Sequence, residues 1–224
     1  MPFNGFPKQS ISFLNELKKN NNRAWFEDNR SDYEAYVMAP SREFVEEMGK
    51  RFAGFDPEVL AEPKVNSSIR RINRDTRFSA DKTPYKDHLD FYFPHRAFKG
   101  RPLYAMRFNT ETVGFGAGLF GFDDTMLARW RTRIDDDASG TSLARTLEKL
   151  KKAGFPPAGQ HWKKVPKGFA EDHPRADLLR HNGIYVGGDI PIPTEFHTKA
   201  LPTLAMRHFR KFRPVVDWVT DMID

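Results

Sequence analysis

The chain has 224 residues, of which 39% are hydrophobic and 29% charged, and this composition excludes disordered and fibrous classes. It contains no cysteine, which excludes disulfides, thiolate catalysis and cysteine metal sites. The net charge of +6 favours anionic partners, and we expect a cytoplasmic protein without secretory leader or membrane contact, because no apolar run is long enough for either.

Apolar residues recur at helical spacing in three segments of the first 54 residues. Ser10 is the predicted N-cap of the first helix, which ends at Asn20-Asn21-Asn22. A second helix is predicted from about Arg23 to Pro40, because proline disfavours a helical conformation in the residue before it. Ser41 is predicted to cap the third helix.

The pattern changes to strands after residue 63. Residues 65–72 read as a strand, residues 74–87 as a polar loop, and residues 88–93 alternate with period two. Two further alternating runs, 102–109 and 111–120, are separated by a short turn and predict an antiparallel hairpin.

Helices dominate the last hundred residues. The elements expected there are helices near 124–134 and 143–150 with a turn over 135–140 between them, a short strand at 161–165, a short helix from Pro174 to about His181, a strand at 183–192 and a helix over 198–223. We therefore expect an α+β fold in a single domain, residues 1–224, with a mostly antiparallel sheet of four or more strands packed with N-terminal and C-terminal helices.

The excess positive charge lies in the middle of the chain. Residues 64–107 carry 11 basic and 4 acidic groups, or +7, whereas residues 1–63 carry −3 and residues 108–224 carry +2. The segment from Arg70 to Lys86 reads RRINRDTRFSADKTPYK and holds six cations and two acids. Two acids cannot neutralise six cations, so this segment is the strongest candidate for a site.

We interpret this segment as a cradle for an anion. Arginine suits bidentate contact with phosphate or carboxylate, and lysine supplies a mobile point charge. The predicted ligand-binding residues are Arg71, Arg74, Arg77, Ser79, Lys82, Tyr85 and Lys86. Candidates for an acid or a base are Asp75, His88 and Asp90. The favoured ligand is an anionic small molecule or nucleotide, and no motif identifies a cofactor, a catalysed reaction or an oligomeric state.

Three other interpretations stay open. The charges can form a purely structural ion-pair network that fixes the loop in a partner-binding protein. Alternatively, basic groups interleaved with aromatic rings are typical of nucleic-acid binding modules, and the rings concerned are Phe78, Tyr85, Phe91 and Tyr92. A metal site at His88-x-Asp90 is the third, but a hydrogen-bonded surface pair without metal is the favoured interpretation of these two residues. A metal would need a third ligand, and the candidates are His161, His173, His181 and His197.

A run of alternating glycines stands out in the second strand of the predicted hairpin. Gly114, Gly116 and Gly118 occupy one face of that strand. Glycine weakens a strand, so this face is expected either to pack closely against backbone or rings, the favoured interpretation, or to form the floor of a ligand site.

The charged segment also carries a resemblance. The string Arg-Ile-x-Arg-Asp-x-Arg-Phe-Ser-x-Asp-Lys-x-Pro-Tyr-Lys over 71–86 resembles the signature of a widespread family of conserved hypothetical proteins, a domain of unknown function found in bacteria, plants and fungi. Matching blocks are Phe13-Leu14-x-x-Leu17, Asn21-Asn22-Arg23-x-Trp25-Phe26, Asn29-Arg30, Pro166-Lys167-Gly168-Phe169, Asp172, His173-Pro174 and Leu178-Leu179. The resemblance implies a single-domain cytoplasmic protein and carries no activity with it.

Overall fold

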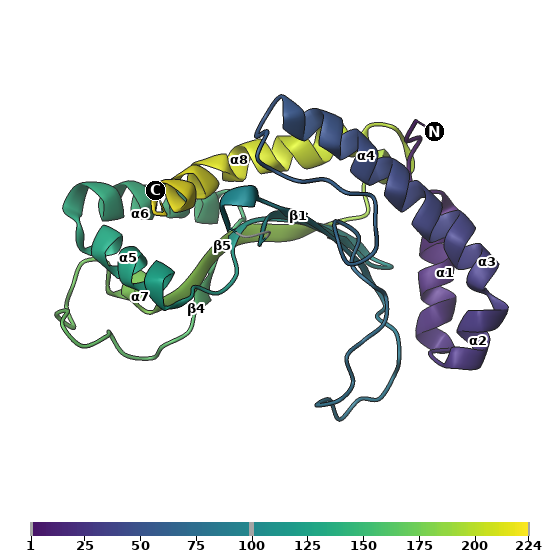
Figure 1. The fold of residues 1–224 in the computed structure, drawn as a ribbon, viewed down its shortest axis with the longest axis horizontal. Helices are drawn as coiled ribbons and strands as arrows, with labels where there is room; N and C mark the ends of the chain where they lie inside the picture. The colour runs from purple at the N-terminus through teal and green to yellow at the C-terminus, as the bar shows by residue number, and fades with distance from the viewer. Residues whose placement is uncertain (1, 99–100, 224) are drawn as a thin grey trace.

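The computed structural model describes residues 2–98 and 101–223 and builds them around one five-stranded sheet (Figure 1). The strands are β1 (Leu89–Pro94), β2 (Pro102–Phe108), β3 (Thr112–Leu119), β4 (Pro157–Gln160) and β5 (His181–Pro191). Their order is β1-β2-β3-β5-β4, and every neighbouring pair is antiparallel. The predicted α+β class with an antiparallel sheet is confirmed, as is the hairpin of β2 and β3.

Helices precede and follow the central strands. The first group is α1 (Lys8–Lys19), α2 (Arg23–Asp28), α3 (Arg30–Asp32), the π-helical turn η1 (Tyr33–Met38) and α4 (Ala39–Ala53). The second is α5 (Asp124–Asp135), α6 (Asp137–Lys152), α7 (Ala176–Leu179) and α8 (Leu201–Asp221), with 3-10 turns η2 (Arg96–Phe98) and η3 (Thr194–His197). No helix in the described part of the chain combines the length and the apolar character needed to cross a membrane.

One face of the sheet packs against α4 and α8, which cross it side by side in Figure 1. Leu89, Phe91 and Phe93 point to this face and are buried, as the period-two pattern predicts. Ring contacts join the layers: Phe44 of α4 lies 5.2 Å from Phe91, and Phe209 of α8 lies 5.1 Å from Tyr104 of β2, both measured between ring centroids. The main core therefore lies between this face and the two helices.

On the opposite face of the sheet, helices lie at the two ends rather than across the strands. Figure 1 shows α1 to α3 descending at one end of the molecule and α5 to α7 at the other, so that the ribbon has the outline of an arch. The loop between residues 70 and 88 descends on the same side, beneath the sheet. Side chains that point to this face include exposed Arg107 and Asp189, so it is accessible to a ligand.

The predicted stop at Pro40 and the caps at Ser10 and Ser41 are wrong. The chain stays helical from α3 through η1 into α4, with Pro40 in the first turn of α4. In a continuous helix the carbonyl of Tyr36 would lose the hydrogen bond that a proline nitrogen cannot donate. The buried hydroxyl of Ser10, inside α1, donates to that carbonyl instead, and the Ser41 hydroxyl donates to Val37 O. The two serines therefore satisfy carbonyls around the π-helical turn.

Four shorter elements also differ from the prediction. Residues 65–72 form only isolated bridges, such as that between Ile69 and Phe91, because Asn66 has a φ of 66° and turns the chain. The turn over 135–140 is reduced to Asp136, which caps α6. The strand expected at 161–165 lies earlier, as β4, where Pro157 is tolerated at a sheet edge. The helix after Pro174 is only α7, since pairing with β4 draws His181 into β5.

Candidate functional site

The basic segment forms a long hairpin-like loop below β1. Its two arms are joined by backbone hydrogen bonds from Arg74 N to Pro84 O at 2.8 Å and from Lys86 N to Ile72 O at 2.8 Å. Asn21, at the turn between α1 and α2, fastens the loop, because its amide accepts from Tyr85 N at 3.0 Å and donates to Tyr85 O at 2.9 Å. The loop is thus tied to the N-terminal helices at its base.

Arg74 is directed into the loop itself. Its guanidinium donates to the Asp81 carboxylate, to the Thr83 hydroxyl and, at 3.4 Å, to the Ser79 hydroxyl. Hydrogen bonds from the Thr83 amide and hydroxyl, together with Arg74, hold the pKa of Asp81 at about 2. Arg74, Ser79 and Asp81 therefore form an internal network, one of the alternatives that the sequence left open.

The charged side chains at the tip of the loop are also paired internally, whereas Arg71 at its base is not. Arg77 donates to both oxygens of Asp75, at 3.0 and 2.7 Å, and these hydrogen bonds hold the pKa of Asp75 at about 2. Lys82 Nζ donates to Thr76 O at 2.9 Å. Arg71 makes no side-chain hydrogen bond or ion pair with any described residue, and Phe78 is 95% exposed.

The Tyr85 ring belongs to the core at the base of the loop. It is buried and stacks on Phe26 with a centroid distance of 4.2 Å. Burial raises the pKa of its hydroxyl above the ordinary value. Among the predicted ligand-binding residues, Tyr85 therefore contributes backbone and shape to the loop base.

Asp90 is the centre of a charged cluster on the open face of β1. Its side chain is only 4% exposed, and it accepts from Arg107 Nε at 2.6 Å and from Lys86 Nζ at 3.1 Å. His88 lies with Nε2 3.6 Å from Asp90 Oδ2 and with Nδ1 2.9 Å from Asp87 Oδ1. Burial raises the pKa of Asp90, but the hydrogen bond from Arg107 and the nearby positive charges outweigh it, so the pKa lies below the ordinary value.

Residues of this cluster line two separate cavities. The first, which we term the loop cavity, has a volume of about 310 Å³ and lies between the α1–α2 turn and the basic loop. Its charged and titratable lining residues are Lys18, Arg74, Asp81, Lys86, Asp87 and His88. Of the predicted site residues, the structure brings Arg74, Tyr85, Lys86 and His88 together here, whereas Arg71, Asp75, Arg77, Ser79 and Lys82 line neither cavity.

The second, which we term the sheet cavity, has a volume of about 300 Å³ and lies on the open face of the sheet. Its lining residues come from β1, β2, β3, β5 and the residue after β3, and include Asp90, Tyr92, Arg107, Gly114, Gly116, Phe120, Tyr185 and Asp189. The Lys86–Asp90 ion pair stands between the two cavities, because Lys86 lines the loop cavity and Asp90 lines the sheet cavity. The prediction missed Arg107, Tyr185 and Asp189, whose only sequence signal is their place on the polar side of alternating strands.

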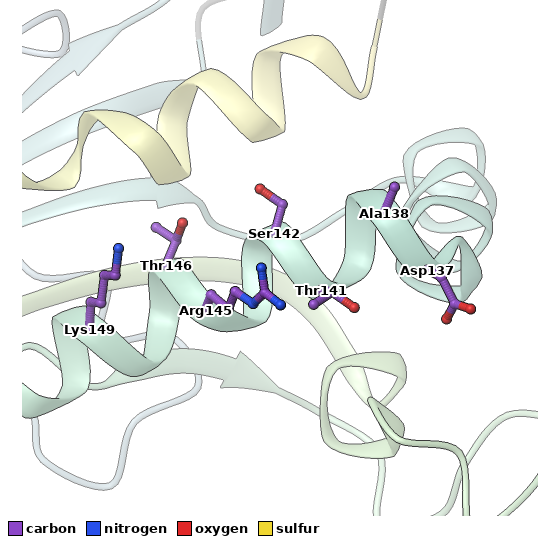
Figure 2. A pocket seen from close by; sticks show the side chains of 7 residues that line it. All are labelled: Asp137, Ala138, Thr141, Ser142, Arg145, Thr146 and Lys149. Carbon is purple, nitrogen blue, oxygen red and sulfur yellow. The ribbon is translucent and has the colours of Figure 1, made fainter.

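A larger hollow of about 500 Å³ is less suited to a ligand. All of its lining residues belong to α6, from Asp137 to Lys149, and Figure 2 shows their side chains directed along and away from one helix. Among the described residues, no second element contributes to its lining. Within residues 2–98 and 101–223, no three His, Asp or Glu side chains are placed to hold a metal ion.

Comparisons with known proteins identify the family without adding an activity. A family model described as a conserved hypothetical protein, DUF2461, matches residues 9–218. No protein of curated function matches the chain. Among solved structures, the chain is similar to an uncharacterized protein from Methanothermobacter thermautotrophicus, with 11% identity, a TM-score of 0.38, and coverage of 80% of this chain and 99% of that chain. Because the family model spans nearly the whole sequence, the chain belongs to the conserved hypothetical protein family DUF2461.

Proposed function

We propose that the protein binds a small phosphate- or carboxylate-bearing ligand in the loop cavity. The observation that carries this proposal is the unused donor capacity of the lysines that line it. An ammonium group has three N–H donors, and Lys86 is held by Asp90 through only one hydrogen bond. Lys18 makes no side-chain hydrogen bond or ion pair with any described residue. An anion in this cavity therefore gains donors without breaking the existing network.

The three candidates for acid or base chemistry differ in their access to the ligand. Asp75 lines neither cavity, and Asp90 lines the sheet cavity, where its lowered pKa keeps it ionised as a partner of Lys86 and Arg107. His88 lines the loop cavity, and its Nδ1 is oriented by Asp87. An enzymatic function of this site would therefore rest on His88.

Calorimetric titration of the full chain with inorganic phosphate, pyrophosphate and citrate at low salt tests the proposal. We expect the Lys86→Gln substitution to weaken binding of the best probe about tenfold, because one charge-assisted hydrogen bond is lost. Lys18→Gln is expected to weaken it several-fold. Lys64→Gln, which alters an exposed lysine outside both cavities, is the matched control. Equal affinity in all three variants would overturn the proposal, as would the absence of binding by every probe.

A nonenzymatic nucleic-acid binding function is the second candidate, and the tip of the loop favours it. Phe78 is fully accessible, and the Arg77 guanidinium lies 5.7 Å from its ring centroid. Exposed rings beside cations are the groups on which single-stranded bases stack. Of the other rings in this interpretation, Phe91 and Tyr85 are buried, so only Phe78 and Tyr92 are available.

Fluorescence anisotropy with a labelled single-stranded oligonucleotide distinguishes the two candidates. A nucleic-acid binder loses affinity steeply as salt rises, and Phe78→Ala is expected to weaken its binding about tenfold. If the oligonucleotide does not bind at low salt while phosphate does, the loop cavity is the functional site and the tip is not.

A further inference from the structure

The sheet cavity has a chemical character distinct from that of the loop cavity. Its charged lining residues are Arg107, Asp90 and Asp189, and the rest of its lining is aromatic or small apart from Met106. Arg107 uses Nε to bind Asp90, and its side chain is 52% exposed. The cavity thus offers both hydrogen-bond donors and acceptors, together with rings, rather than a concentration of positive charge.

The floor of this cavity is flat because side chains are absent from it. The register of the sheet places Ala105, Gly116 and Gly187 in one row across β2, β3 and β5. With neighbouring strands about 4.8 Å apart, this row is about 10 Å wide. The floor therefore has the width of a flat heteroaromatic ring system.

The glycines on this face differ in whether the surrounding backbone leaves room for a side chain. A Cβ at Gly118 would lie 2.2 Å from Ile184 O, and its φ is 126°, while a Cβ at Gly187 would lie 2.5 Å from Phe115 O. These two glycines are required by the backbone, as close packing predicts. A Cβ at Gly116 would lie 3.3 Å from Val186 O, a contact that a shift of a few tenths of an ångström relieves. The backbone therefore restricts residue 116 less than residues 118 and 187.

Aromatic rings stand at two borders of the floor. Tyr185 and Phe120 are stacked with centroids 4.2 Å apart, and Phe120 is 48% exposed. Tyr92 lies at the β1 end of the row that contains Ala105 and Gly116, with the Arg70 guanidinium 5.2 Å from its ring centroid. The Asp189 carboxylate lies directly above Gly114, within reach of a donor on a bound ring.

We propose that the sheet cavity binds the base of a nucleotide whose phosphate occupies the loop cavity. This inference rests on the proposed function, because the phosphate is the anion assigned there. A base has flat apolar faces, which suit the floor and the rings, and edge donors and acceptors, which suit Asp189 and Arg107. The Lys86–Asp90 ion pair marks the boundary at which the two parts of the ligand join.

Titration of the full chain with the four nucleoside 5′-monophosphates, the matching nucleosides and ribose 5-phosphate tests the inference. At least one monophosphate is expected to bind about tenfold more tightly than ribose 5-phosphate, which lacks the ring. Gly116→Ala places a methyl group on the floor and Tyr185→Leu removes a bordering ring. Both variants are expected to abolish this preference and to leave the affinity for ribose 5-phosphate unchanged. Gly54→Ala, where a Cβ has no neighbour within 4 Å, is the matched glycine control.

The outcomes separate the two proposals. If ribose 5-phosphate binds but no monophosphate binds more tightly, or if both variants keep the wild-type preference, the base site is overturned and the anion site stands. If only a nucleoside binds, and Gly116→Ala abolishes that binding, the ring site stands and the anion site is overturned. Failure of all probes overturns both proposals. Thermal unfolding of each variant shows whether an altered preference reflects a local change or loss of the fold.

Discussion

Asp90 shows how one residue organises the charges of the open face. The sequence places it on the polar side of a strand, as a candidate acid or base. In the structure it is almost fully buried and binds Arg107 and Lys86. A buried carboxylate with two cationic donors is stabilised in its ionised form, so its contribution is to hold those donors in position.

Asp90→Asn is expected to lower the free energy of unfolding by about 2 kcal/mol at pH 7, because two charge-assisted hydrogen bonds weaken. Since the pKa of Asp90 is lowered in the folded state, its stabilising contribution is complete above the ordinary carboxyl pKa of about 4 and is lost as the pH falls through the lowered value. Urea denaturation of wild type and variant at pH 7 and pH 3 measures this difference, which should be smaller at pH 3.

Asp189→Asn is the matched control for that experiment. Asp189 lies in the same row of the sheet as Asp90 but is exposed, with no ion pair to any described residue. The control is expected to change the unfolding free energy by less than about 0.5 kcal/mol. Equal losses for the two variants, or a loss at Asp90 that does not depend on pH, would contradict the assignment.

At the scale of elements, the basic loop owes its shape to the N-terminal helices as much as to its own ion pairs. The Asn21 amide makes both hydrogen bonds that a neighbouring strand would make to Tyr85. The two residues are 64 positions apart in the chain. The turn after α1 therefore pairs with the base of the loop in place of a neighbouring strand.

Asn21→Ala is expected to cost about 1–3 kcal/mol in unfolding free energy, because it leaves two partly buried backbone groups of Tyr85 without their partners. Hydrogen exchange should increase over residues 72–86 and stay unchanged in β2 and β3. Asn20→Ala removes one local, exposed hydrogen bond to Glu16 O and serves as the control. Unchanged exchange in the loop of the Asn21 variant would show that the loop holds its shape alone.

At the scale of the whole molecule, a residue near the start of the chain packs into the core. Phe6 is fully buried and stacks on Phe196 with a centroid distance of 4.9 Å, and its amide donates to Phe196 O at 3.0 Å. It also lies 4.8 Å from the ring of Phe108 in β2. A residue near the N-terminus therefore joins β2 to the turn that precedes α8.

Phe6→Ala is expected to lower the unfolding free energy by about 3–5 kcal/mol, as for other large buried rings. Phe78→Ala makes the same chemical change at a fully exposed position and is expected to cost less than about 0.5 kcal/mol. Chemical denaturation of both variants provides the comparison. A small loss at Phe6 would mean that the first residues do not contribute to the core.

Sequence periodicity is sufficient for much of this fold, because it reflects local geometry. Alternation over β1, β2 and β3 correctly identifies the residues that face the core, and helical spacing locates α1, α5, α6 and α8. Periodicity wrongly predicts a helix end at Pro40. The helix continues there because the Ser10 hydroxyl, 26 residues away in the chain, donates a hydrogen bond to the Tyr36 carbonyl. Periodicity also misplaces β4, which contains a proline and a glycine that disfavour a strand but pairs with β5 nonetheless.

The sequence by itself determined the α+β class, the segment that carries the excess charge, and the family. Only the tertiary structure decided which of those charges are paired: Arg74 and Arg77 bind acids within the loop, while Lys86 joins Asp90 and Arg107 on the sheet. Residue types and their spacing reflect local backbone preferences, whereas the free donors of a site depend on contacts between residues distant in the chain. For this reason the +6 charge only predicts an anionic partner, whereas the folded sheet and loop define the cavities in which we propose that it binds.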